Sequence, residues 1–312
     1  MENTIVKIEK LSHRYGGPWA IRDINLVVDR VGIVGFLGAN GAGKSTTMNI
    51  LCGALRQTEG NVYIDGIDMA KDPVEAKKRI GFLPQVAPLH LDLTVDEYLT
   101  YCAHLRDIHP RKVPEALEYA KERCGIRHFS KRVIGNLSGG YRQRVGIAQS
   151  IIHQPKLVVM DEPTNGLDPN QILEVRALIK EIAQDRAVIV STHILSEVQV
   201  LCREIRMVNA GKIVFSDTIE AFNNYIAPHS LLMRMGAPPP QEKLLSIPGV
   251  TKVEFLTERQ LRVYFNAEEY NADSVTDQLV KASVRDSWQL RELGQDKHAL
   301  DEIFAHLSNH KK

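Results

Sequence analysis

The chain has 312 residues, a length that allows one large domain and one smaller domain. Hydrophobic residues make up 44% of the sequence and charged residues 25%, which excludes intrinsically disordered, collagen-like and disulfide-scaffold proteins. The 39 basic and 38 acidic side chains nearly cancel, so no overall basic field favours nucleic acid as a partner. The four cysteines form no CxxC pair, which removes support for a zinc ribbon or a thioredoxin-like redox site.

The sequence contains no segment suited to a membrane. No stretch approaches the roughly 18 consecutive apolar residues of a membrane-spanning helix, and the first ten residues carry no hydrophobic leader. We therefore expect a chain that neither spans a membrane nor enters one unaided. Lone thiols in such a chain fit a reducing cytoplasm.

The first 225 residues alternate between predicted strands and helices. Period-two alternation and short apolar runs predict strands at 4–10, 21–28, 33–37, 157–160 and 187–190. Helices are predicted at 46–51, from 168 onward and near 195–202, and residues 87–153 are mostly helical, with a capping box formed by Thr94 and Glu97. Fully apolar strands between helices are typical of a parallel sheet covered on both faces, so we expect an α/β domain.

Residues 226–312 have a different pattern. Strands are predicted at 231–235, 250–256, 261–265 and 288–293, and helices at 240–247, 273–284 and 299–307. The order strand, helix, strand, strand, helix, strand is that of the ferredoxin-like arrangement. We therefore predict two domains, 1–225 and a small α+β domain over 226–312.

A glycine-rich loop follows the predicted strand at 33–37. Its residues, Gly38-Ala39-Asn40-Gly41-Ala42-Gly43-Lys44-Ser45, match G-x-x-x-x-G-K-[ST] in full, and Thr46 then begins a helix. Backbone N–H groups in such a loop point inward at phosphate oxygens, and the helix N-terminus adds its positive end. Lys44 would reach the β- and γ-phosphates and the Ser45 hydroxyl would bind Mg²⁺. The alternative, a glycine-rich turn with a chance lysine, does not account for the placement between strand and helix.

Two acidic residues, Asp161 and Glu162, come directly after the apolar strand at 157–160. A carboxylate at the end of a buried parallel strand lies at the edge of the sheet where ligands bind in α/β folds. We expect Asp161 to hold Mg²⁺ and Glu162 to orient and deprotonate an attacking water molecule. Taken alone, the pair could equally be two solvated acids, and the phosphate loop is what favours the catalytic interpretation.

Residues 137–144, Leu-Ser-Gly-Gly-Tyr-Arg-Gln-Arg, resemble the signature motif of ATP-binding-cassette (ABC) ATPases. Further matches to this family follow its order along about residues 4–215: Tyr15, Gln85, Gly166-Leu167-Asp168-Pro169 and His193. The resemblance implies a P-loop ABC ATPase domain with a mixed sheet and a helical subdomain at about 87–153. ATP and Mg²⁺ are the ligands that it implies.

The resemblance also assigns roles to single residues. It implies that Tyr15 stacks on adenine, that Gln85 binds Mg²⁺ and water, and that His193 contacts the γ-phosphate. It further implies that Ser138, Gly139 and Gly140 complete the ATP site of a partner subunit, so that two chains close two ATP molecules, and that Asp168 belongs to the nucleotide site. Each residue also has an ordinary alternative: a packing tyrosine, a loop glutamine, a core histidine, or a serine that caps a helix.

Two finer resemblances narrow the subfamily. Drug-resistance and ABC-2-type export ATPases resemble this chain in having a small C-terminal domain that ends in an element such as 299–304. Residues 141–148, 168–172 and 191–199 look most like gliding-motility-associated export ATPases. The implied function is an ATP-hydrolysing subunit, homodimeric or paired with another ATPase, at the cytoplasmic face of a membrane. It would be held there by a separate permease through a groove near 82–106.

The main alternative is an ABC ATPase that works away from transport, on ribosomes or nucleic acid or as a regulator. Translation-factor relatives carry two cassettes and DNA-repair relatives insert long coiled coils, whereas this sequence has one phosphate loop and no sustained heptad run. Transport is therefore favoured and no nucleic-acid partner is expected. A regulatory ATPase that never engages a permease stays open.

Overall fold

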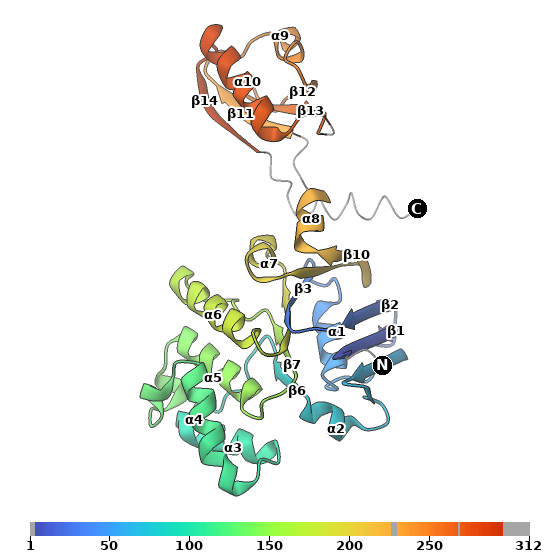
Figure 1. Cartoon of the computed structure of the whole chain (residues 1–312), viewed down its shortest axis with the longest axis vertical. Helices are drawn as coiled ribbons and strands as arrows, with labels where there is room; N and C mark the ends of the chain where they lie inside the picture. Colours follow the sequence, from blue (N-terminus) through green and yellow to red (C-terminus); the bar gives the residue numbers. More distant parts are fainter. Residues whose placement is uncertain (1–3, 226–229, 268, 296–312) are drawn as a thin grey trace. The chain divides into compact units, whose positions relative to one another are not determined.

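The structure is a computed structural model that describes residues 4–225, 230–267 and 269–295. The chain divides into two compact units, residues 1–222 and 223–312 (Figure 1). Helix α8 (Ile219–Tyr225) spans this division and also contains the predicted boundary at residue 225.

A six-stranded sheet in the order β10-β9-β3-β8-β7-β6 forms the centre of the first unit. The strands are β3 (Gly32–Leu37), β6 (Ile80–Leu83), β7 (Leu157–Asp161), β8 (Ala187–Thr192), β9 (Glu204–Asn209) and β10 (Lys212–Thr218). All neighbours pair in parallel except β9 and β10, which form a hairpin. Every residue of β7 and β8 is buried, because the sheet is covered on both faces, which is why these strands are apolar runs in the sequence.

A second, antiparallel sheet has the order β2-β1-β4-β5. Its strands are β1 (Val6–Arg14), β2 (Trp19–Val28), β4 (Glu59–Ile64) and β5 (Ile67–Asp68), of which the sequence patterns predict only the first two. Helix α1 (Lys44–Leu51) contributes Met48, Ile50 and Leu51 to one apolar core that also includes side chains of β1, β2, β4 and the central sheet. This shared core anchors the helix that follows the glycine-rich loop.

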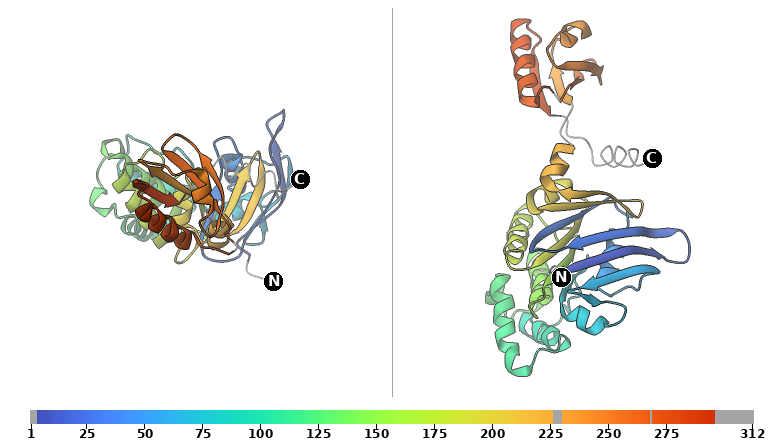
Figure 2. Two further views of the ribbon diagram at one scale, coloured as in Figure 1. Left: turned by 90° about the horizontal axis from the view of Figure 1, so that it is seen from above. Right: turned by 45° about the vertical axis from the view of Figure 1, so that its right-hand side comes forward.

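A helical segment lies between β6 and β7 (green in Figure 1). It consists of α3 (Val95–Leu105), α4 (Val113–Arg123) and α5 (Gly139–Ile151), joined by the 3-10 turns η1 (Pro110–Lys112), η2 (Arg127–Phe129) and η3 (Ile134–Asn136). The predicted capping box at the start of α3 is present: the Thr94 hydroxyl accepts from the Glu97 N–H, and the Glu97 carboxylate accepts from the Thr94 N–H. The right view of Figure 2 shows this segment and the blue strands β1 and β2 as separate parts of the first unit.

The remaining helices of this unit are α2 (Pro73–Lys78), α6 (Pro169–Ile182) and α7 (Leu195–Leu201). Helix α6 buries Val175, Leu178, Ile179 and Ile182, while Ile172, expected on the same face, is half-buried. In the parts of the chain that the structure describes, no helix is both long enough and apolar enough to cross a membrane.

His153, just past α5, makes folding sensitive to acid. Burial lowers the pKa of His153 to about 3, and its Nε2 lies 3.0 Å from the Ile80 carbonyl oxygen. In the unfolded chain the His153 imidazole binds a proton below about pH 6.5, whereas in the folded chain it stays neutral. The free energy of unfolding therefore decreases as pH falls below about 6.5. Relative to His153→Gln, we expect the wild type to lose up to about 1.4 kcal/mol of unfolding free energy per pH unit. Urea unfolding at pH 7, 6 and 5 measures this, and identical slopes for the two proteins would contradict it.

The second unit is a four-stranded antiparallel sheet in the order β12-β13-β11-β14. Its elements are β11 (Ser230–Met235), α9 (Gln241–Leu245), β12 (Val250–Phe255), β13 (Gln260–Phe265), α10 (Ala272–Arg285) and β14 (Leu290–Gln295). Leu244 of α9 and Leu279 of α10 pack into one core with the inward-facing residues of the strands. Both the order of elements and the order of strands are those of the predicted ferredoxin-like arrangement. The helix predicted at 299–307 lies outside the described residues.

Candidate active site

The glycine-rich loop connects β3 to α1 at the carboxyl edge of the central sheet. Two of its glycines are required by geometry: Gly43 has a left-handed φ of 105°, and a Cβ on Gly38 would lie 2.6 Å from the Val208 carbonyl oxygen. The Gly38 N–H donates to the Thr192 carbonyl oxygen at 3.3 Å, which ties the loop to the end of β8. The loop therefore has the compact path and the helix N-terminus that phosphate binding needs.

Lys44 is the first residue of α1, and its side chain is only 5% exposed. The Nζ atom donates to the carbonyl oxygens of Gly38, at 2.8 Å, and Ala39, at 3.3 Å. It also lies 3.4 Å from Oε1 of Glu162. The loop thus wraps around a buried ammonium group.

Glu162 follows β7 and connects two other parts of the site. Its Oε2 lies 2.9 Å from Nδ1 of His193, which follows β8, while its Oε1 faces Lys44. The carboxylate is buried and the His193 side chain is 40% exposed. Because β3, β8 and β7 are adjacent parallel strands, their carboxyl ends bring Lys44, His193 and Glu162 together.

Asp161, the last residue of β7, is buried and accepts a hydrogen bond from the Ser191 hydroxyl. Ser45 is half-buried in the first turn of α1. Within the described residues, no group of three or more His, Cys, Asp or Glu side chains could hold a metal ion by itself. A hydroxyl and one carboxylate instead fit Mg²⁺, which is usually bound by one or two carboxylates together with substrate phosphates.

Tyr15 and Gln85, which the sequence assigns to the same site, differ in their contacts. The Tyr15 ring is exposed, and its hydroxyl lies 3.3 Å from the Thr46 hydroxyl, so the structure brings this ring to the start of α1. Gln85 follows β6 at the same edge of the sheet, but its exposed side chain makes no hydrogen bond to another described residue. The structure thus places Gln85 at the correct edge and leaves its side chain outside the cluster.

The signature residues lie at the start of α5. The Ser138 hydroxyl caps this helix by accepting from the Tyr141 N–H at 3.4 Å. Gly140 is packed so closely that a Cβ would lie 2.7 Å from the Gln171 side chain, whereas a Cβ on Gly139 would make only an ordinary contact, 3.9 Å from Leu167. Among the hydrogen bonds of the described residues, none joins Ser138, Gly139 or Gly140 to the glycine-rich loop or to Glu162. The signature residues and the glycine-rich loop are therefore two separate elements of the described chain.

Asp168 caps α6. Its Oδ1 accepts from the backbone N–H groups of Asn170 and Gln171, both at 3.0 Å. The carboxylate is therefore engaged in starting the helix, which is also the ordinary role of an aspartate at this position.

Two residues near Glu162 were not predicted from the sequence. Gln143 of α5 donates through Nε2 to the Pro163 carbonyl oxygen at 2.6 Å. Glu197 of α7 is buried against Thr164 and Thr192. Gln143 lies in the signature stretch and could have been singled out there, but a glutamate in a short surface helix gives no signal in the sequence.

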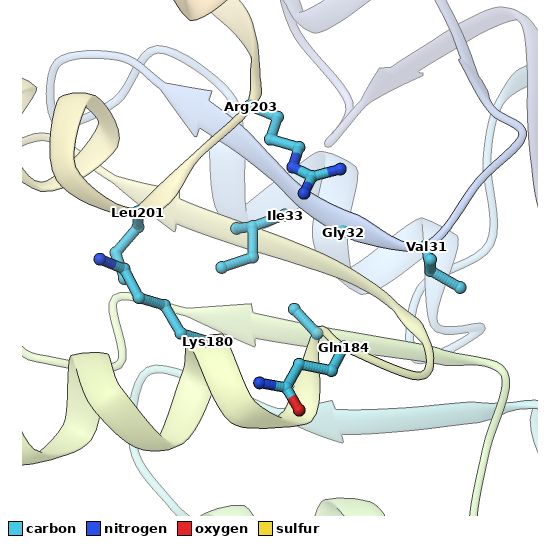
Figure 3. Close-up of a pocket in the computed structure, with 8 residues that line it drawn as sticks. Val31, Gly32, Ile33, Lys180, Gln184, Leu201 and Arg203 are labelled. Carbon is cyan, nitrogen blue, oxygen red and sulfur yellow. The ribbon is translucent and has the colours of Figure 1, made fainter.

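A cavity of about 430 Å³ lies elsewhere in the first unit (Figure 3). Its lining includes Gly32 at the start of β3, Lys180 of α6 and Arg203 before β9. Because β3 runs from Gly32 to Leu37, this cavity is at the edge of the sheet opposite the glycine-rich loop. It is not part of the candidate active site.

Comparisons with known proteins identify the family of the chain. The family model described as ABC transporter matches residues 21–165. The bacitracin transport ATP-binding protein BcrA of Bacillus licheniformis is 37% identical over 214 residues, which are 68% of this chain and 69% of BcrA. The structure of CbiO1 from Clostridium perfringens, part of the ABC transporter complex CbiONQ, has a TM-score of 0.66 at 27% identity and covers 72% of this chain and 92% of CbiO1.

A second solved structure shows a nucleotide-bound relative. It is a dimeric post-hydrolysis state of the ATP-binding cassette MJ0796 bound to ADP and Pi, with a TM-score of 0.62 at 25% identity, and it covers 69% of this chain and 98% of that one. The fold class predicted from the sequence, a P-loop ABC ATPase domain, is confirmed by these structures. The chain belongs to the ATP-binding proteins of ABC transporters, and it binds and hydrolyses ATP.

Proposed function

We propose that the chain is the ATPase subunit of an ABC-2-type exporter and that Glu162 activates the water molecule that attacks ATP. The observation that carries this proposal is the position of one buried carboxylate between Lys44 of the phosphate loop, at 3.4 Å, and His193, at 2.9 Å. A carboxylate in this place lies where the terminal phosphate of a nucleotide on the loop would meet water.

The residues of the loop would bind and orient the nucleotide. The backbone N–H groups of 38–46 would surround its phosphates, and Lys44 would hold the β- and γ-phosphate oxygens. Tyr15, exposed beside Thr46, would stack on the adenine. Orientation of this kind lowers the barrier before any bond is broken.

Mg²⁺ would be held by the Ser45 hydroxyl and Asp161, with Gln85 as a further ligand. Bound there, the ion would neutralise charge on the phosphate oxygens. Asp161 is positioned for this by the hydrogen bond from Ser191. Gln85 would need its exposed side chain to turn toward Asp161, which its place on the loop after β6 permits.

The Glu162 carboxylate would accept a proton from the attacking water molecule. His193 holds one of its oxygens, which leaves the orientation of the carboxylate fixed while the proton is transferred. A protonated imidazole would donate from Nδ1 to Glu162 and from Nε2 to the γ-phosphate oxygens.

The signature residues Ser138, Gly139 and Gly140 would complete the ATP site of a second subunit, with Asp168 at the same interface. This proposal rests on the separation of these residues from the loop in one chain and on the dimeric arrangement of the MJ0796 cassette. A symmetric, head-to-tail dimer would close two equivalent sites.

Ser138→Arg tests the shared site. We expect ATP hydrolysis to fall by about tenfold or more, because the large cation would block the second half of the site. Nucleotide binding to the isolated chain should stay within about twofold of wild type, because Ser138 is separate from the glycine-rich loop of its own chain and separate sites act independently. Phosphate release and fluorescent-nucleotide titration measure the two quantities.

The control for Ser138→Arg is Asn271→Arg in the second unit. Asn271 is also a helix cap, since its side chain accepts from the Ser274 N–H at 2.7 Å. This variant loses a cap but changes none of the residues proposed to complete the partner's ATP site, so it should hydrolyse ATP at the wild-type rate. Full activity of Ser138→Arg would contradict the shared site.

A membrane permease would dock on an apolar surface that follows β6. Large apolar side chains are exposed along residues 86–105, namely Val86, Leu91, Tyr101 and Leu105, with exposed fractions from 46% to 82%. CbiO1, a relative in structure, is part of a transporter complex, and we propose the same kind of assembly here. The chain would then be located at the cytoplasmic face of the membrane through its permease.

The transport role is supported by the relative BcrA, whose name assigns it to bacitracin transport, and the export direction rests on the sequence resemblance and on the second unit. We also propose that residues 1–225 form the ATP-binding domain and that residues 226–312 form an accessory domain. The resemblance of 141–148 and 191–199 to gliding-motility-associated export ATPases is its most specific part and is supported by sequence alone.

A further inference from the structure

Glu197 is a buried acidic residue that has no part in the proposed reaction. It lies in the first turn of α7, a helix of seven residues, and is 1% exposed. A glutamate in a short surface helix is ordinarily solvated, because burying a carboxylate is unfavourable unless it is paired and hydrogen-bonded. Its surroundings must therefore compensate the charge.

Three side chains provide this compensation. The Thr164 hydroxyl donates to Oε1 at 2.5 Å, and the Thr192 hydroxyl donates to Oε2 at 2.7 Å. The Arg176 guanidinium lies 3.4 Å from Oε1 and supplies the opposite charge. Each oxygen of the carboxylate thus has a hydroxyl donor of its own.

The two threonines belong to the two turns that carry the proposed catalytic groups. Thr164 lies two residues after Glu162, and Thr192 immediately precedes His193. Thr192 also accepts from the Ile194 N–H at 3.1 Å, so its hydroxyl is fixed from both sides. One carboxylate therefore joins the turn after β7 to the turn after β8.

The turn after β7 needs such support. Glu162 has a left-handed φ of 51°, which residues other than glycine adopt rarely and which the surrounding structure must impose. Gln143 holds this turn through the Pro163 carbonyl oxygen, at 2.6 Å. Glu197 holds it through the Thr164 side chain.

We propose that Glu197 is a positioning residue for hydrolysis. By fixing the Glu162 turn to the His193 turn, it holds the 2.9 Å contact between Glu162 and His193. This inference rests on the proposed function of Glu162 as the group that activates water. Glu197 itself does not touch the nucleotide site.

Glu197→Ala and Glu197→Gln test this role. We expect Glu197→Ala to lower kcat by about tenfold or more while KM and nucleotide affinity stay within about twofold, because the loop is untouched. Glu197→Gln keeps one acceptor and should recover part of the rate. Thr192→Val is the second route if Glu197→Ala folds poorly, since it removes one hydroxyl with little change of shape and should lower kcat severalfold.

The matched control is Glu204→Gln. Like Glu197, Glu204 is a paired carboxylate; it is partly buried and bound to Arg30 and Arg206, but it lies at the start of β9, away from both turns. The kcat of the Glu204→Gln variant should equal that of the wild type. A wild-type kcat in both Glu197→Ala and Thr192→Val would overturn the proposal.

Hydrogen exchange gives a readout that does not depend on activity. In Glu197→Ala the amides of 162–168 and 191–195 should exchange about tenfold faster or more, while those of α1 keep their protection. Equal acceleration in α1, with kcat and nucleotide binding falling together, would show a merely structural role and overturn the proposal. Retained turnover in Glu162→Gln would contradict the proposed function. Faster amide exchange confined to 162–168 and 191–195 in Glu197→Ala would even then support the proposal that Glu197 joins the two turns.

Discussion

Glu162→Gln is expected to lower ATP turnover by about 100-fold or more, because an amide cannot accept the proton of the attacking water molecule. The amide keeps the shape of the carboxylate and can still bond to His193, so ATP binding should be retained. With hydrolysis suppressed, the ATP-bound dimer should persist and be detected by sedimentation. Phosphate release and nucleotide titration on the purified chain measure turnover and binding.

Glu181→Gln is the control for this substitution. Glu181 lies on α6, is half exposed and pairs with Arg123, away from the loop. It should leave turnover unchanged. Turnover of Glu162→Gln at the wild-type rate would show that another group activates the water molecule.

Lys44→Ala is expected to weaken ATP binding by about tenfold or more and to abolish measurable hydrolysis, because a hydrogen bond to a charged group is worth about 1.5–3 kcal/mol. The substitution also removes the cation that faces buried Glu162 at 3.4 Å. Titration with a fluorescent ATP analogue measures the loss of affinity.

Lys71→Ala is the matched control for this second substitution. Lys71 lies in the same unit and its side chain is 84% exposed. This variant should bind and hydrolyse ATP as the wild type does. Wild-type affinity in Lys44→Ala would contradict the assignment of the phosphate loop.

The sequence predicts most of the fold because the signals are local. Apolar runs mark β7 and β8, glycines mark the turn into α1, and Thr94 with Glu97 marks the start of α3. The strands β4 and β5 were not predicted, since β4 alternates only weakly and β5 has two residues. Their place in the sheet is fixed by pairing with β1, which is a non-local contact.

The residues of the candidate site likewise fall into those that local sequence predicts and those that only non-local contacts explain. Lys44 was predicted from the glycine-rich motif, Glu162 from its position after a strand and His193 from the family resemblance. Adjacent parallel strands bring these positions together. Glu197 could not be predicted, because only the hydroxyls of Thr164 and Thr192 make its burial favourable. Nor does the sequence separate the two uses of Ser138, as helix cap and as partner-site ligand, since both need the same hydroxyl at the same helix start.

The central claim is that one complete ATP site is built from two chains, and mixing two inactive variants tests it directly. A dimer of one Lys44→Ala chain and one Ser138→Arg chain contains one intact site and one site that is damaged twice. In an equal mixture half of the dimers are of this kind, so about a quarter of the wild-type sites should be intact. Mixing should therefore restore hydrolysis to about that fraction of the wild-type rate. Hydrolysis that stays at the level of the separate variants at every mixing ratio would contradict it.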